Sequence, residues 1–194
     1  MREAKIERNT LETKIKIQLD LDGEGKYDIK TGIPFFDHML CLFAKHGLFD
    51  LTVRADGDTE VDFHHTVEDT GIALGQAFLK AMGDKAGMRR YATRILPMDE
   101  ALVLVSLDLS GRPYLAYDVA FLTEKTGDFD AQLTEEFLRG FAVAAGATLH
   151  VKKIDGVNTH HIIEGIFKAL GRALDEATAR DPRVTGIPST KGTL

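Results

Sequence analysis

The sequence predicts an α+β fold built from two similar halves, in which β-sheets pack against a layer of helices. The first observation is a repeat: HHTVEDTGIALGQAF, beginning at His64, matches HHIIEGIFKALGRAL, beginning at His160. Both histidines, the glutamate, the Ala-Leu-Gly triplet and a following alanine coincide, which indicates internal duplication. The second observation is that strand-like and helix-like apolar patterns precede both copies in the same order. We therefore expect one domain of two repeats, about 1–86 and 87–194.

In the first half, KIKIQLDLDG alternates polar residues with Ile15, Ile17, Leu19 and Leu21, which is the period of a half-buried strand. YDIK follows an Asp-Gly turn signal and is predicted as a short return strand. PFFDHMLCLFAKHG has apolar residues at helical spacing and predicts a helix. LTVRADG then predicts a strand, and a second helix is expected over about 61–82.

The second half repeats this order. ALVLVSLDLSG and RPYLAYDVAF alternate as strands, LTEEFLRGFAVAAG reads as a helix, LHVKKI as a strand, and HHIIEGIFKALGRALDEATAR as a long helix. Each half is thus β-β-α-β-α. Antiparallel strand pairs with two helices per half favour an α+β sandwich, with sheets on one side and helices on the other.

The repeat extends upstream of the histidine pairs if the preceding turns differ by two residues. Leu51 and Val53 then align with Leu149 and Val151, and each strand closes on an Asp-Gly turn signal. In the same register DHML falls on EEFL. This alignment places His38 opposite Glu136.

Composition excludes several classes of function. The net charge is −6, and the basic residues are interleaved with acidic ones, so the basic patch of a nucleic-acid binder is missing. MREAKIERNT lacks the apolar core of a signal peptide, and no apolar run approaches the roughly 20 residues that span a bilayer. We expect a cytoplasmic protein with a small-molecule partner, whose anionic groups would be held by local basic residues.

The repeated motif predicts metal binding. Residues four apart share a helix face, so His64 and Glu68 can converge on one ion. The adjacent His65 points about 100° away and can serve a second centre. Imidazole and carboxylate without thiolate suit Mn, Fe, Zn or Ni and argue against Ca and Mg. A single such motif is usually structural, but two copies at matched positions favour a metal site.

Two further histidines have open roles. His150 aligns with Thr52 in the first half, and we interpret it as supporting a ligand or the fold, with direct ligation less favoured. His46 ends a predicted helix, where a cation is favourable, and it is equally well interpreted as a site residue.

Five segments together resemble the imidazoleglycerol-phosphate dehydratase family over nearly the whole chain: GIPFFDHMLCLFAKHG, DFHHTVEDTGIALGQAF, LSGRPYL, THHIIEGIFKALGRAL and PSTKG. The resemblance implies a duplicated, ribosomal protein S5 domain 2-like fold. It implies a hydro-lyase of histidine biosynthesis that converts D-erythro-imidazole glycerol phosphate to imidazole acetol phosphate and water. It also implies two Mn²⁺ per active site and a homo-oligomer of 24 subunits, built from trimers, with sites between subunits.

The resemblance also implies roles for individual residues. The catalytic residues would be Glu12, His65 and Glu164. The metal ligands would be His38, His64, His65, Glu68, Glu136, His160, His161 and Glu164. Family members often carry histidine where this chain has Glu136, and a carboxylate is also a competent ligand. The substrate-binding residues would be Glu12, His38, His46, His64, Arg90, Arg112, His160, Lys168, Ser189, Thr190 and Lys191.

The expected chemistry explains these residue types. No carbonyl acidifies the proton that leaves, so an enolate route is closed. Two metal ions flanking the imidazole would stabilise an imidazolate, which expels the neighbouring hydroxyl through a diazafulvene-like intermediate. A carboxylate base, for which Glu12 is the candidate, would then remove the adjacent proton to give an enol. The arginines, Ser189 and Lys191 would hold the phosphate.

Two other classes of protein remain as alternatives. A binuclear metal hydrolase would use paired ions to activate water and would act on generic phosphoesters. A non-catalytic metal-binding or storage protein would bind metal without needing Glu12, Arg112 or Lys191.

Overall fold

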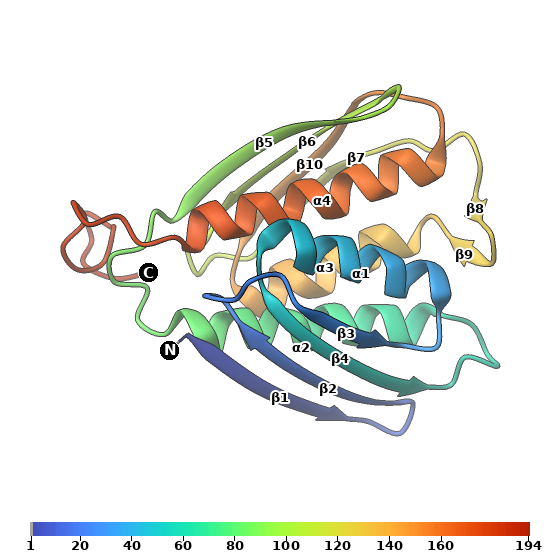
Figure 1. Cartoon of the computed structure of the whole chain (residues 1–194), viewed down its shortest axis with the longest axis horizontal. Coiled ribbons are helices and arrows are strands. Elements are labelled where there is room, and N and C mark those ends of the chain that lie inside the picture. The colour runs from blue at the N-terminus through green and yellow to red at the C-terminus, as the bar shows by residue number, and fades with distance from the viewer. Residues whose placement is uncertain (1) are drawn as a thin grey trace.

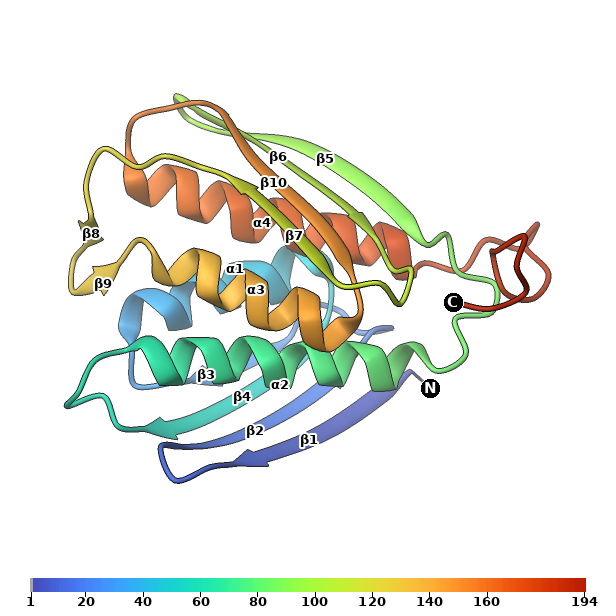
Figure 2. The ribbon, with the colours of Figure 1, turned by 180° about the vertical axis from the view of Figure 1, so that it is seen from behind.

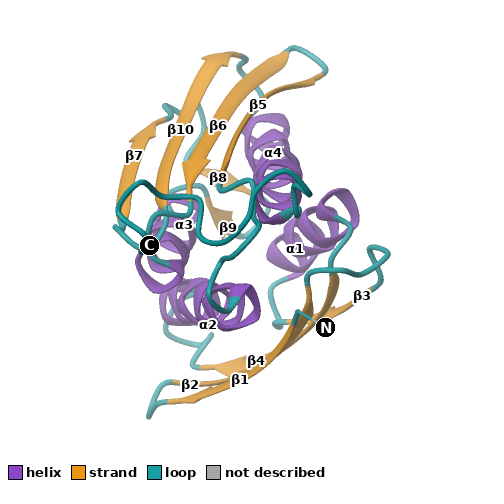
Figure 3. Ribbon diagram, turned by 90° about the vertical axis from the view of Figure 1, so that its left-hand side faces the viewer, coloured by secondary structure: helices purple, strands orange, loops and turns teal. Residues whose placement is uncertain are grey.

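The computed structural model describes residues 2–194 and places a layer of helices between two four-stranded sheets (Figures 1 and 3). The helices are α1 (Pro34–Gly47), α2 (His64–Met82), α3 (Leu133–Ala145) and α4 (Thr159–Thr178). The strands are β1 (Glu3–Asn9), β2 (Thr13–Asp20), β3 (Tyr27–Lys30), β4 (Asp50–Gly57), β5 (Tyr91–Met98), β6 (Ala101–Asp108), β7 (Tyr114–Asp118), β8 (Lys125–Thr126), β9 (Phe129–Asp130) and β10 (Thr148–Asp155). The predicted fold class, a duplicated α+β arrangement with sheets on helices, is confirmed.

The two sheets have the same topology. The first has the order β1-β2-β4-β3 and the second β5-β6-β10-β7, so β4 corresponds to β10 and β3 to β7. The first three strands of each sheet are antiparallel, and the fourth runs parallel to its neighbour. YDIK, predicted as a return strand, therefore lies beside β4 and not beside β2. The alternation in β2 has its predicted effect, because Ile15, Ile17 and Leu19 are buried.

The structure adds elements that the patterns did not predict. Each half opens with an extra edge strand, β1 or β5, and β8 and β9 form a small hairpin. β1 carries charged residues at most positions, which weakens its apolar alternation. β5 contains Pro97, which an edge strand tolerates because one side needs no ladder hydrogen bonds.

The helices pair between the halves. α1 of the first half packs against α4 of the second, and α3 packs against α2 (Figure 2). The glycines of the repeated Ala-Leu-Gly triplets permit these contacts. A Cβ on Gly75 would lie 2.5 Å from the carbonyl oxygen of Phe141, and one on Gly171 would lie 2.5 Å from that of Phe43.

The sheets lie on opposite sides of the helices, whereas we expected both on one side. α2 contacts β1 and β2, and α4 contacts β5 and β6, so each half covers its own sheet (Figure 3). The buried faces of the helices then meet in one core, in which Phe78 packs edge-on against Phe141 at 5.5 Å between ring centroids. Among the helices of residues 2–194, none combines the length and apolar character that crossing a bilayer requires.

Candidate active site

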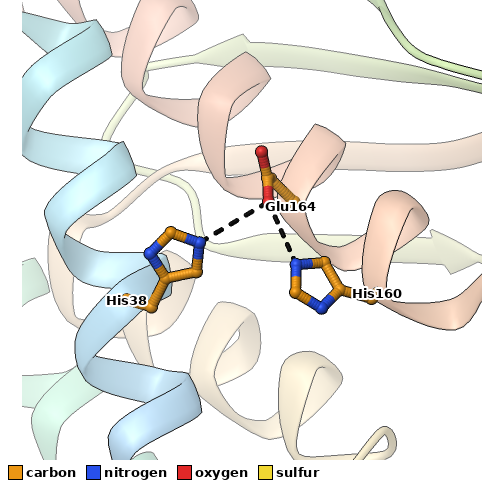
Figure 4. A group of neighbouring side chains, drawn as sticks. All are labelled: His38, His160 and Glu164. Atoms are coloured by element: carbon orange, nitrogen blue, oxygen red, sulfur yellow. Dashed lines mark hydrogen bonds and ion pairs between the residues drawn. The ribbon is translucent and has the colours of Figure 1, made fainter.

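One cluster of candidate ligands lies where α1 meets α4. His38 of α1 faces His160 and Glu164 of α4, and one ligand atom from each lies within 4.8 Å of the others (Figure 4). The Glu164 Oε2 atom is 3.1 Å from His160 Nε2 and 3.6 Å from His38 Nε2. Helical i, i+4 spacing explains the first contact, and packing between the halves explains the second. We call these three residues the α1–α4 cluster.

The carboxylate of Glu164 is the buried member of this cluster. Burial acts to raise its pKa, but hydrogen bonds from Lys168 and His160 and the Lys168 charge outweigh burial, so the pKa is lowered. Lys168 Nζ lies 2.5 Å from Glu164 Oε1. The cluster thus presents an ionised carboxylate beside two imidazoles, with a cation already in contact.

The first turn of α4 is fixed by a cap. The side chain of Asn158 accepts hydrogen bonds from the backbone amides of His160, at 2.9 Å, and His161, at 3.3 Å. Satisfying these otherwise free amides stabilises the helix start. Both histidines of the second motif therefore begin from an ordered turn.

The matching cluster on α2 is more open. His64 Nε2 lies 3.9 Å from Glu68 Oε2, and both side chains are 41% exposed. Glu136 lies half-buried on α3, the helix that packs against α2. Within residues 2–194, its carboxylate makes no hydrogen bond or ion pair. The alignment of Glu136 with His38 is thus consistent with the helix pairing, but the structure does not bring Glu136 into contact with His64 or Glu68.

The second histidine of each motif is held by a carboxylate. His65 Nδ1 lies 2.9 Å from Asp58 Oδ2, and His161 Nδ1 lies 2.7 Å from Glu100 Oε2. These hydrogen bonds are the main cause of a raised pKa at both histidines. The bond from His161, followed by backbone hydrogen bonds such as that from Asn158, lowers the pKa of Glu100 to about 2. In each motif the planes of the two imidazole rings are nearly perpendicular, at 85° and 80°.

Neither of these carboxylates was predicted from the sequence. Asp58 directly follows β4, and Gly156 occupies its place in the second half. Glu100 lies in the turn between β5 and β6. Extending the repeat alignment into that turn would have found Glu100, because it falls on Glu12.

Glu12 itself lies in the turn between β1 and β2, close to the first motif. Its carboxylate is 55% exposed, and Oε2 is 3.8 Å from His65 Nδ1. The structure therefore brings the predicted base to the predicted catalytic histidine.

The predicted phosphate-binding residues gather in a separate open pocket of roughly 560 Å³. Its lining comprises Arg90, Tyr91, Arg112, Pro188, Ser189, Thr190 and Lys191. Arg90 is 8% exposed; it pairs with Asp108 at 2.7 Å and donates to the carbonyl of Pro188 at 2.9 Å. The Asp108 hydrogen bond raises the pKa of Arg90. Arg90 thus anchors the C-terminal segment, and Tyr91, whose ring lies 4.5 Å below its guanidinium, is a lining residue that we did not predict.

This pocket lies far from the histidine clusters. The backbone amide of Arg90 donates to the carbonyl of Ala177 near the end of α4, whereas His160 lies at its start (Figure 1). A rise of 1.5 Å per residue separates these two points by about 25 Å. One small substrate cannot contact both groups within a single chain.

His46 and His150 are the two histidines whose roles the sequence left open. His46, in the last turn of α1, has a pKa lowered first by burial and then by the charge of Lys168, so it lies near the α1–α4 cluster. His150 lies exposed on β10, with its ring centroid 5.9 Å from that of Tyr114. His150 therefore belongs to neither histidine cluster.

Fold and clusters together define an internally duplicated α+β protein whose paired helices present imidazole and carboxylate groups suited to a transition-metal ion. A sequence model of the family described as imidazoleglycerol-phosphate dehydratase matches residues 31–174. The chain belongs to this family. The assignment implies a lyase that carries out a dehydration in histidine biosynthesis.

Individual relatives agree with the assignment. The imidazoleglycerol-phosphate dehydratase of Caldanaerobacter subterraneus subsp. tengcongensis is 64% identical, with both chains covered in full. That of Thermoanaerobacter pseudethanolicus is 62% identical, again over both full chains. The crystal structure of the Staphylococcus aureus enzyme has a TM-score of 0.84 at 41% identity, covering 92% of this chain and 99% of that one. The Pyrococcus furiosus enzyme, solved in complex with (S)-C348, has a TM-score of 0.84 at 40% identity, with 97% and 100% covered.

Proposed function

We propose that this chain dehydrates D-erythro-imidazole glycerol phosphate to imidazole acetol phosphate in the cytoplasm, with two Mn²⁺ ions per active site. The observation that carries the proposal is the α1–α4 cluster, in a chain of this family. Its histidines and carboxylate come from both halves of the duplication. The matched cluster on α2 supplies the same residue types for a second ion.

The residues present fit manganese. The α1–α4 cluster offers two imidazole nitrogens and one carboxylate oxygen, a donor set that borderline divalent ions accept. Asp58 and Glu100 hold Nδ1 of His65 and His161, which leaves Nε2 of each ring available as a ligand. The ligands would be the eight residues given by the family resemblance. The ions would supply Lewis-acid stabilisation of negative charge on the substrate's imidazole.

Proton transfer would fall to residues near the first motif. Glu12 is exposed enough to meet a substrate and lies beside His65. Its carboxylate would remove the proton from the carbon next to the one that loses hydroxyl, and the enol that remains would become the ketone. His65, oriented by Asp58, would hold an ion beside Glu12, while Glu164 would stay ionised and bind positive charge in the site.

The phosphate would bind in the pocket of Arg90, Arg112, Ser189, Thr190 and Lys191. Arg112 is 66% exposed on its side chain and is free to turn toward an anion. Because this pocket lies about 25 Å along α4 from His160, the two ends of the substrate would be held by different chains. The protein would therefore act as an oligomer with sites between subunits, and we propose the 24-subunit assembly built from trimers.

Product formation tests the reaction. Manganese-loaded protein is incubated with imidazole glycerol phosphate, and imidazole acetol phosphate is quantified. Turnover without hydrolysis of a generic phosphoester supports the dehydratase. Absence of product with verified metal content rejects it, and phosphoester hydrolysis would favour the hydrolase alternative.

Mixing variants tests the shared site. His160→Ala and Lys191→Ala chains, each inactive alone, are unfolded, mixed and reassembled. Recovery of activity supports a site built from two chains, since some sites would receive both intact ends. Arg183→Ala, on an exposed arginine of the same C-terminal region, serves as the control and should keep full activity. No recovery in mixed assemblies of normal size contradicts the shared site.

A further inference from the structure

A partly buried ion pair lies one residue beyond the candidate ligand Glu68. Asp69 of α2 is 6% exposed, and its Oδ1 lies 2.9 Å from Nε and 2.8 Å from Nη2 of Arg8 on β1. The Thr13 hydroxyl, also buried, donates to Asp69 Oδ2 at 2.5 Å. A carboxylate out of water is costly unless fully paired, and this one is paired on both oxygens. We call Arg8, Thr13 and Asp69 the hairpin clamp.

Hydrogen bonds lead from this clamp to Glu12. The Thr13 hydroxyl gives its proton to Asp69, so at 3.2 Å it accepts from the Thr10 hydroxyl. The Thr10 oxygen in turn accepts the backbone amides of Glu12, at 3.1 Å, and Thr13, at 2.9 Å. Because each hydroxyl has one proton, these bonds run from Thr10 through Thr13 to Asp69. The Thr10 hydroxyl also lies 3.5 Å from a second acceptor, the carbonyl of Thr13.

The other side of Glu12 is also fixed. Its carbonyl accepts the backbone amide of Asp58 at 3.1 Å, and Asp58 is the residue that holds His65. Among residues 2–194, the ion pairs and hydrogen bonds of the Glu12 carboxylate are, by contrast, limited to the 3.8 Å contact with His65 Nδ1. The position of this carboxylate is therefore set by its backbone and not by bonds of its own.

The second half of the duplication lacks the clamp. The strand registers show which residues of the two halves are equivalent. Ile17 pairs with Val53 in the first sheet, and Val105 pairs with Val151 in the second. By this register Thr13 corresponds to Ala101, and Glu12 corresponds to Glu100. By the same register, Arg8 corresponds to Leu96, because their partners Ile15 and Val103 are equivalent. The histidine motif equates Asp69 with Gly165.

The difference between the halves matches a difference in task. Glu100 is anchored by its own side chain, to His161 Nδ1 at 2.7 Å and to the amide of Asn158 at 2.9 Å. In the first half, Asp58 and not Glu12 makes the hydrogen bond to His65 Nδ1, and the Glu12 carboxylate remains exposed. A carboxylate that is free to meet a substrate makes no anchoring hydrogen bonds of its own. Its position must then be fixed by other residues that hold its backbone.

We propose that the hairpin clamp is a positioning device that holds the Glu12 turn against α2 for proton transfer. The inference rests on the proposed function, in which Glu12 is the acid–base group. Asp69, Arg8 and Thr13 touch no reacting atom. They fix the distance between the turn and the helix that carries His64, His65 and Glu68, and displacements near 1 Å at such positions can cost about 100-fold in rate.

Removal of the Thr13 hydroxyl tests the clamp. Thr13→Val keeps the shape of the side chain, and we expect kcat to fall about tenfold with KM and manganese content unchanged. Thr13→Ser restores the hydroxyl and should recover kcat. Thr70→Val is the matched control: this buried threonine lies next to Asp69, but its hydroxyl donates within α2 to Thr66, so kcat should stay at the wild-type value.

Two readouts separate positioning from general damage. Amide hydrogen exchange over residues 10–13 should accelerate in Thr13→Val but not in Thr70→Val. In a Glu12→Gln background, Thr13→Val should cause no further loss of rate, because the clamp acts through that carboxylate. Three outcomes would overturn the proposal. The first is a full additional loss of rate when Thr13→Val is added to Glu12→Gln. The others are a wild-type kcat in Thr13→Val alone, or equal losses of kcat in Thr13→Val and Thr70→Val. If the wild-type protein shows no turnover, the proposed function fails while the exchange measurement still tests the clamp.

Discussion

The carboxylate of Glu100 accepts a hydrogen bond from Nδ1 of His161 at 2.7 Å, in the place where the first half carries Glu12. Two residues in equivalent turns have thus taken different roles. Glu100 orients a candidate metal ligand, and Glu12 stands 3.8 Å from the corresponding histidine. The duplication supplied two similar sets of groups whose contacts differ: the Glu100 carboxylate is hydrogen-bonded to a histidine, whereas the Glu12 carboxylate is 55% exposed.

This relationship predicts a specific loss of metal affinity. Glu100→Gln weakens the acceptor on His161, and support of this kind typically changes metal affinity 10- to 100-fold. We expect manganese affinity, measured by titration calorimetry, to fall about tenfold. Glu12→Gln should leave that affinity unchanged while lowering turnover to a small residual rate. Equal manganese affinity in Glu100→Gln and wild type would argue against the orienting role.

Metal removal should act on both activity and assembly. We expect EDTA to abolish turnover and to shift the sedimentation profile toward smaller oligomers, since ligand binding to the assembled state stabilises it. Added Mn²⁺ should restore both. A sedimentation profile that stays unchanged after metal analysis confirms removal would contradict the link to assembly.

Much of the site could be predicted because its signals are local in sequence. The spacing of His160 and Glu164 on one helix face gave two of the three residues of the α1–α4 cluster, and the repeat drew attention to His38. The pairing of α1 with α4 could not be predicted, since apolar periodicity identifies a buried face without identifying what covers it.

The missed residues have non-local signals. The equivalence of Glu100 with Glu12 follows from the register of β6 beside β10. The roles of Arg8 and Asp69, 61 residues apart in sequence, appear only when β1 lies on α2. β1 escaped prediction because its alternating charged residues leave few apolar positions.

The glycines of the repeated triplets should be intolerant of alanine. A Cβ on Gly75 would lie 2.5 Å from the Phe141 carbonyl oxygen and 2.8 Å from the Ala144 Cβ, so α2 and α3 must separate. Overpacking of this kind costs about 1–3 kcal/mol, which exceeds the roughly 1 kcal/mol that alanine gains in helix propensity. We expect Gly75→Ala to lower the free energy of unfolding, measured by denaturant titration at fixed protein concentration. Gln76→Ala, at the next and exposed position, is the control; equal stability of the two variants would contradict the packing argument.

Asp175 of α4 should make stability depend on pH. Burial, the largest effect, raises its pKa above the ordinary value of 3.8, although Arg172 and Arg94 oppose the shift. The folded state therefore holds this proton more tightly than the unfolded state. The resulting stabilisation is present below pH 3.8 and is lost as pH rises through the folded pKa.

At pH 7 the ionised Asp175 carboxylate opposes folding, and an uncharged amide of the same shape does not. We expect Asp175→Asn to be more stable than wild type at pH 7, with the difference shrinking as the pH approaches the ordinary pKa of 3.8. Denaturant titrations at several pH values measure the difference directly. Asp56→Asn, on an exposed residue of β4, controls for the loss of one negative charge and should show a smaller change. A variant less stable than wild type at pH 7 would mean that the neighbouring arginines, and not burial, dominate the energetics of Asp175.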